Sequence, residues 1–134
     1  MSNPAEPVYL DLDDLIAAHR AIHGSAPEIR DAGLVASALA RPQMSLGGED
    51  AYPDLPSKAA ALMQSIARNH ALIDGNKRLA WIATALFLEL NGVSLQPPSQ
   101  DAIVDFVLQV ATGELPDVDD IAKVLDEWSV APGQ

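Results

Sequence analysis

One short segment, residues 70–78, gathers a histidine, an aspartate, a glycine, an asparagine and two adjacent cations. A neutral imidazole at His70 could take a proton from an attacking hydroxyl. The carboxylate of Asp74 suits Mg²⁺, which binds through one or two carboxylates together with phosphate oxygens. Gly75 allows a tight turn and the close approach of an anion to the backbone. Together these groups predict a catalytic loop that binds phosphate.

The segment connects two predicted helices, and the second, about residues 76–90, is almost wholly apolar after Arg78. A helix that is apolar on all sides belongs in the centre of a bundle. Its N-terminus offers unpaired N–H groups and the positive end of the helix dipole. Cations at Lys77 and Arg78 are unfavourable there unless an anion binds, and a phosphate is the natural one. Two side chains keep two interpretations each: Asn76 could hold a phosphate oxygen or the loop itself, and Asp74 could be only the helix N-cap.

The rest of the chain predicts an all-α fold in one domain, residues 1–134, with an ordered core of about 8–130. Capping residues and helical periodicity predict six helices near residues 11–23, 31–41, 57–69, 76–90, 99–112 and 117–128. We expect a compact bundle around the apolar 76–90 helix. Residues 42–56 are rich in proline and glycine and predict a loop, either a surface connection or a functional flap.

Composition excludes several classes of protein. The net charge is −11, with 19 acidic and 8 basic residues, so the surface repels a nucleic-acid backbone and we expect no direct nucleic-acid binding. The chain contains no cysteine, which excludes disulfides and thiolate metal sites. No apolar run approaches the roughly 18 residues that span a bilayer, and the N-terminus lacks the features of a signal peptide. We therefore expect a cytoplasmic protein without a membrane segment.

The run His-x-x-x-Asp-Gly-Asn-Lys-Arg at residues 70–78 resembles the signature of the Fic/Doc family. It is most similar to the Doc toxin branch, which has lysine where Fic proteins have a second glycine. Three weaker similarities accompany it, at Arg68, at Leu90-Asn91-Gly92-Val93 and at residues 111–114. The resemblance covers about residues 8–130. It implies a helical fold with the signature loop at the N-terminal end of a central helix.

The resemblance also implies an ATP-dependent, protein-modifying transferase. His70 would be the general base for a serine, threonine or tyrosine hydroxyl of a target protein, and Asp74 would hold Mg²⁺. The nucleotide-binding set would be Arg68, Asp74, Gly75, Asn76, Lys77 and Arg78. Fic proteins generally transfer AMP, whereas the Doc branch is associated with the terminal phosphoryl group, so Lys77 favours a protein kinase. AMP transfer is the alternative, and a catalytically inactive binding module is the non-enzymatic one.

The same resemblance implies two protein partners. The substrate would be a translation GTPase of the elongation factor Tu class. Because the chain lacks the inhibitory Ser/Thr-x-x-x-Glu-Gly-Asn helix of some Fic proteins, we expect an antitoxin whose tail folds as a helix in a groove near the motif. Two positions depart from the family pattern. Leu72 replaces an aromatic residue and is expected to repack the core, and Ile82 replaces an asparagine, which can change ATP affinity or orientation.

Other residues have structural interpretations. His19 and His23 have a spacing that could bind a metal, but no acidic or cysteine partner accompanies them. Trp81 and Trp128 have apolar neighbours at helical spacing, which predicts core packing rather than a nucleobase platform. Arg41 precedes the long loop; it could contact nucleotide or target, although a surface position is the default.

Overall fold

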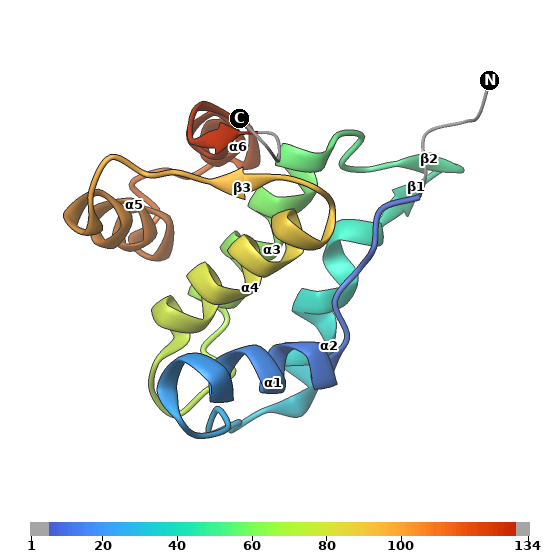
Figure 1. Ribbon diagram of the computed structural model, residues 1–134. Helices are drawn as coiled ribbons and strands as arrows, with labels where there is room; N and C mark the ends of the chain where they lie inside the picture. The colour runs from blue at the N-terminus through green and yellow to red at the C-terminus, as the bar shows by residue number, and fades with distance from the viewer. Residues whose placement is uncertain (1–5, 131–134) are drawn as a thin grey trace.

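The computed structural model describes residues 6–130, in which six α-helices form the fold (Figure 1). The elements in chain order are α1 (Leu12–His23), α2 (Ala32–Ala40), the 3₁₀ helix η1 (Arg41–Gln43), β1 (Ser45–Leu46), β2 (Glu49–Asp50), α3 (Leu55–Arg68), α4 (Asn76–Leu90), β3 (Ser94–Leu95), α5 (Gln100–Thr112), α6 (Val118–Glu127) and β4 (Ser129–Val130). The predicted all-α class is confirmed. None of the helices in this part of the chain combines the length and apolarity needed to cross a bilayer.

The helix boundaries follow the capping residues of the sequence. Asp11 begins α1 by accepting a hydrogen bond from the Asp14 amide (2.8 Å), and Gly24 ends it with a left-handed φ of 79°. The third helix starts slightly earlier than expected. Asp54 is its N-cap, because the carboxylate accepts the Ser57 amide at 2.8 Å and the intervening proline is tolerated in the first turn.

Residues 42–56, expected to be a loop, contain most of η1, a small antiparallel hairpin of β1 and β2, and the first two residues of α3. Glycines at 47–48 form its turn with φ values of 59° and 85°. An ion pair between Lys58 and Asp50 (3.3 Å) ties the hairpin to the first turns of α3. The hairpin precedes α3 and the 70–78 loop follows α3 (Figure 1). The length of this 14-residue helix therefore separates the hairpin from the loop by about 20 Å. The hairpin is therefore not a lid over the loop.

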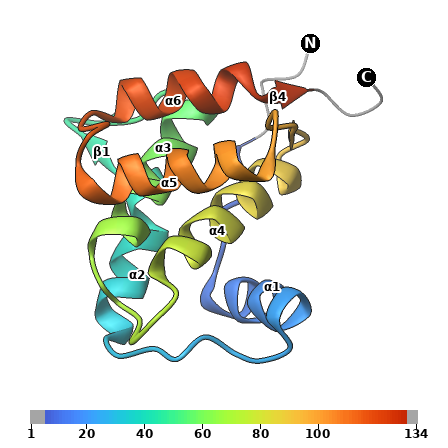
Figure 2. The ribbon, with the colours of Figure 1, turned by 90° about the vertical axis from the view of Figure 1, so that its left-hand side faces the viewer.

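Two helices, α3 and α4, share the centre of the molecule (Figures 1 and 2). Helix α3 packs against α2, α4, α5 and α6, whereas α4 contacts α1, α3 and α5. The sequence predicted only α4 as central, from its apolar run. Small side chains such as Ala59 and Ala60 let neighbouring helices approach α3 closely, and both are fully buried. The buried polar side chains of α3 are satisfied; Gln64, for example, donates to the Pro116 carbonyl at 3.0 Å.

The two ends of the described chain are each bonded to the segment that follows or ends α4. The Asn91 side chain bonds the backbone of Val8 in both directions, at 2.7 and 2.8 Å. Strand β3, which follows α4, pairs antiparallel with β4, in the register Ser94 with Val130. This pairing was not predicted, because strands of two residues leave no periodic signal in the sequence.

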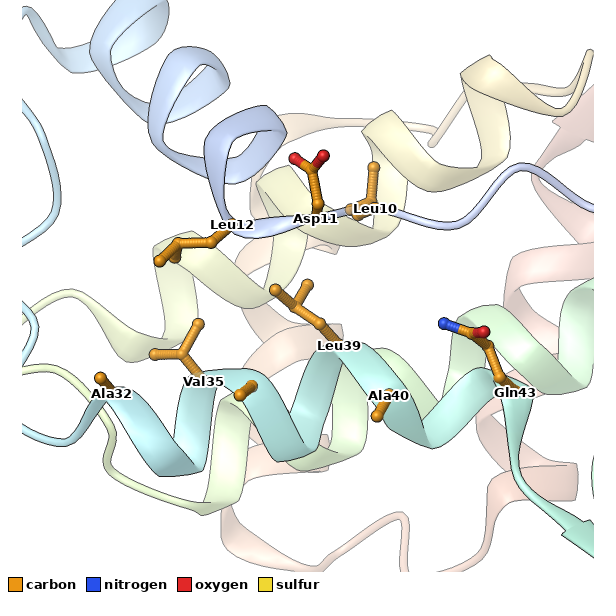
Figure 3. A pocket seen from close by; sticks show the side chains of 9 residues that line it. Leu10, Asp11, Leu12, Ala32, Val35, Leu39, Ala40 and Gln43 are labelled. Carbon is orange, nitrogen blue, oxygen red and sulfur yellow. The ribbon is translucent and has the colours of Figure 1, made fainter.

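Among the smaller cavities of the molecule, one lies between the segment before α1 and the helix α2 (Figure 3). It has a volume of about 280 Å³ and is lined mainly by aliphatic side chains, among them Leu12, Val35 and Leu39. None of the residues in the 70–78 segment borders it. We assign no function to this cavity.

Candidate active site

The 70–78 loop is held in place by the connection between α1 and α2. The amides of Arg30 and Asp31 both donate to the Ala71 carbonyl, at 2.8 and 3.0 Å. An isolated antiparallel bridge joins Ile29 to Leu72. Leu72 itself is only 1% exposed and belongs to the main hydrophobic core. Leu72 therefore packs in the core, and its effect relative to an aromatic residue at this position stays a prediction.

The Asn76 side chain closes the loop. Its Oδ1 accepts a hydrogen bond from the Leu72 amide (2.9 Å), and its Nδ2 donates to the Leu72 carbonyl (3.1 Å). The sequence left two roles open for this amide, phosphate binding and loop closure. The structure shows loop closure, and Asn76 also lines the motif cavity, so its contact with phosphate stays a prediction.

Helix α4 begins at Gly75, which has a φ of 84° and provides no side-chain cap. Asp74 is not the N-cap, contrary to one of the two expectations, because its Oδ1 accepts the neighbouring Gly75 amide instead (2.9 Å). A Cβ on Gly75 would meet Arg78 at an ordinary 3.5 Å, so the positive φ, rather than lack of space, favours glycine here. The first amides of α4 therefore have no side-chain acceptor and are suited to bind an anion.

A cavity of about 240 Å³ lies between this loop and the C-terminal end of α5. The residues of the motif that line it are His70, Asp74, Gly75, Asn76 and Lys77. Five of the residues predicted from the sequence thus border one cavity. Thr112 of α5 also lines it; the similarity at residues 111–114 pointed to this segment, but its hydroxyl was not predicted as a site group.

His70 has an unusual backbone conformation. Its φ is 53°, the only positive value at a non-glycine residue in the described residues. The left-handed region costs an L-amino acid about 1–2 kcal/mol, and such residues concentrate at functional sites. The imidazole is exposed and borders the cavity, so it can meet a hydroxyl that arrives from solvent.

Arg78 lies in a second, larger groove of about 630 Å³ between α1, α4 and α5. Lys77 borders both this groove and the motif cavity. His23, at the end of α1, also lines the groove. Desolvation, then the Arg78 guanidinium and then His19 lower the pKa of His23 below its ordinary value, which favours the neutral ring. The fixed positive charge at this end of the groove therefore comes from Lys77 and Arg78.

Arg68 is not part of the candidate site, contrary to expectation. Its Nε donates to the Val110 carbonyl (2.7 Å) and its NH2 to the Leu115 carbonyl (2.8 Å). It borders neither the motif cavity nor the groove that contains Arg78. A half-buried guanidinium that bonds two carbonyls joins α3 to the turn between α5 and α6. We therefore assign Arg68 a structural role.

Arg41 has a structural role as well. Its Nε donates to the Tyr52 hydroxyl and its NH1 to Ser65 Oγ, each at 2.9 Å. These bonds fix η1 and the end of the hairpin segment to α3. The arginine therefore stabilises the fold rather than the motif cavity.

The residues of the loop fit Mg²⁺ only in company with a phosphate. Within residues 6–130 no group of three or more histidine, aspartate or glutamate side chains gathers around one point. His19, whose spacing from His23 could have suited a metal, is instead a structural residue. It is buried, and its Nδ1 donates to the Ser25 carbonyl at 2.6 Å. Asp74 is the one carboxylate at the motif cavity. Mg²⁺ commonly binds through one carboxylate, water and phosphate oxygens, which matches this arrangement.

Comparisons with known proteins agree with the signature. The model of the Fic/DOC family matches residues 9–88. The chain is 48% identical to Toxin Doc of Mycolicibacterium smegmatis (strain ATCC 700084 / mc(2)155) over 124 residues, which covers 92% of this chain and 95% of that protein. The chain therefore belongs to the Fic/DOC family. Members of this family generally transfer groups derived from a nucleotide onto proteins.

Proposed function

We propose that this protein is a Doc-type toxin that transfers the terminal phosphoryl group of Mg-ATP to a hydroxyl of a target protein. The observation that carries the proposal is the motif cavity. There the exposed imidazole of His70 and the carboxylate of Asp74 border the uncapped start of α4 at Gly75. The similarity to Toxin Doc supports the toxin assignment.

The arrangement suits phosphoryl transfer, which depends mainly on positioning and charge neutralisation. The hydroxyl oxygen would form a bond to the γ-phosphorus while the bond from that phosphorus to the bridging oxygen breaks, and ADP would leave. His70 would accept the hydroxyl proton. The open amides of α4 and the Lys77 ammonium would neutralise phosphate oxygens. Mg²⁺ held at Asp74 would supply further neutralisation of the same oxygens.

Labelled ATP tests the proposal directly. The purified protein is incubated with a cell lysate, and separately with purified elongation factor Tu, using ATP labelled at either the γ- or the α-phosphate. We expect transfer of the γ-label to one protein, and growth arrest when the chain is expressed alone. Transfer of the α-label would support AMP transfer instead. Transfer of neither label would favour an inactive binding module.

Lys77 is the residue that favours phosphoryl over AMP transfer. Its side chain borders both the motif cavity and the neighbouring groove, so it fills space and adds charge where a nucleotide would pass between them. We expect Lys77→Gly to lower phosphoryl transfer and to permit some AMP transfer. The mass added to the target, a phosphate or an adenylyl group, measures the change. Lys123→Gly, on the exposed face of α6, is a control for the loss of a lysine. An unaltered product and rate in Lys77→Gly would show that Lys77 does not decide which group is transferred.

Asp74→Ala tests the metal site. We expect the magnesium concentration needed for half-maximal transfer to rise about 10- to 100-fold, the range observed when groups that support a metal are removed. The unfolding free energy should change by less than about 1 kcal/mol, because Asp74 bonds only the adjacent amide and does not cap α4. Asp126→Ala, an exposed carboxylate on α6, is the matched control. An unchanged magnesium dependence would show that Asp74 does not hold the metal.

The groove that contains Arg78 is the proposed site for the tail of an antitoxin. Most of its lining is apolar, and three large side chains along it are strongly exposed: Ile22 (61%), Val104 (56%) and Leu108 (46%). Such a surface suits the apolar face of an amphipathic helix. Lys77 and Leu108 border the groove and the motif cavity alike, so an occupant would lie beside the phosphate site.

Co-expression with the neighbouring gene tests the antitoxin. We expect a small partner that copurifies with the chain and restores growth. Val104→Asp places a charge on the exposed apolar rim and should weaken this partner while sparing transfer. A chain that is harmless when expressed alone and that captures no small partner would argue against a toxin, even with an active ATP site.

A further inference from the structure

The direction of the His70 side chain depends on the backbone conformation of this residue and not on packing around the ring. The imidazole is exposed, so no surrounding core fixes its direction. Its positive φ of 53° is a conformation that few residues other than glycine adopt without support. Some contact must therefore keep this peptide in place if the ring is to border the cavity next to Asp74.

The side chain that contacts the His70 backbone is Arg30, from the connection between α1 and α2. Its NH2 donates a hydrogen bond to the His70 carbonyl, 40 positions away in sequence. Arg30 is exposed, and the described residues contain no ion pair with a carboxylate for it. A hydrogen bond from a charged donor is stronger than one from a neutral donor. The bond to this carbonyl is thus the one side-chain hydrogen bond of the guanidinium within the described residues.

The residues on both sides of His70 are held by other groups. Asn69 Nδ2 donates to the Leu34 carbonyl at 3.0 Å, and Asn69 Oδ1 accepts the Ala71 amide at 3.2 Å. The Ala71 carbonyl accepts two backbone amides of the α1–α2 connection. Loss of the Arg30 side chain would therefore free the His70 carbonyl while its neighbours keep their bonds.

We propose that Arg30 is a positioning residue for His70: its guanidinium holds the His70 carbonyl and thereby the left-handed backbone that aims the imidazole into the motif cavity. The effect on transfer rests on the proposed function, whereas the effect on conformation does not. Arg30 could not be selected from the sequence, because it lies outside the signature and is one exposed arginine among several.

The experiment compares Arg30→Met, Arg30→Lys and the control Arg20→Met, an exposed arginine on α1 without a side-chain hydrogen bond to the loop. The first readout is the NMR cross-peak between the amide proton and Hα of residue 70, which is strong only when φ is positive. We expect a strong peak in wild type and Arg20→Met, a weak one in Arg30→Met, and an intermediate one in Arg30→Lys, which retains a single donor nitrogen.

The second readout is transfer. We expect kcat to fall about 10- to 100-fold in Arg30→Met, the scale of a misplaced catalytic group, with KM for ATP within about two-fold of wild type because the phosphate-binding amides are untouched. Thermal melting checks that each variant is folded. If Arg30→Met does not fold, the result for Arg30→Lys decides. A strong cross-peak in the folded variant, or full kcat despite a weak one, would overturn the proposal. Full kcat in Arg30→Lys with a weak cross-peak would show that only the charge matters, which also overturns it. A wild type without transfer, but with the expected cross-peaks, would reject the proposed function alone.

Discussion

His70→Ala should reduce transfer by about 10²–10⁴-fold, the usual contribution of a general base. The ring is exposed and borders the motif cavity, so its loss removes a proton acceptor without opening the core. The unfolding free energy should stay within about 0.5 kcal/mol of wild type, as for other surface substitutions. Single-turnover transfer with saturating Mg-ATP measures the chemical step apart from binding.

His70→Asn separates the loss of the proton acceptor from a change in backbone conformation. Asparagine adopts the left-handed region more readily than most residues, so this variant keeps the loop conformation but cannot take up the proton near neutral pH. We expect a loss of transfer equal to that of His70→Ala, together with an unchanged melting temperature. Transfer by either purified variant at the wild-type rate would show that His70 is not the base.

Phe87→Ala should destabilise the protein by about 3–5 kcal/mol, the range for removal of a buried aromatic side chain. Phe87 is 1% exposed, belongs to the main core and stacks on Tyr9 with ring centroids 6.0 Å apart. Small domains are stable by about 5–15 kcal/mol in total, so the loss is a large share. Chemical denaturation followed by circular dichroism measures it.

Leu90→Ala is the matched control for Phe87→Ala. It removes a large apolar side chain from the same helix, but one that is 45% exposed. We expect a loss below about 1 kcal/mol, since the position leaves little cavity. Equal losses in the two variants would contradict the burial that the structure assigns to Phe87.

Capping chemistry made the helices predictable. Aspartates before α1 and α2 and the serine before α5 each accept a nearby backbone amide, as their sequence positions indicated. The apolar run of α4 and the stop at Asn91-Gly92 predicted both ends of that helix. The cluster of motif residues around one cavity was also expected, because residues 70–77 lie close together in sequence.

Tertiary contacts were not predictable in the same way. Arg68 lies two positions before His70, but its guanidinium bonds carbonyls of α5 and of the following turn, more than 40 positions away. Arg30 contacts the loop across a similar distance in sequence. The destination of a long side chain depends on which helices pack together. A single sequence shows the periodicity of each helix but not these pairings.

The bonds that hold Val8 to Asn91 and Val130 to Ser94, at the far end of α4, have a practical consequence. The 15 residues of α4 place this end about 22 Å from the motif at its start. A fusion partner or fluorophore attached at either end of the chain would therefore be anchored at the end of α4 that is remote from the motif cavity.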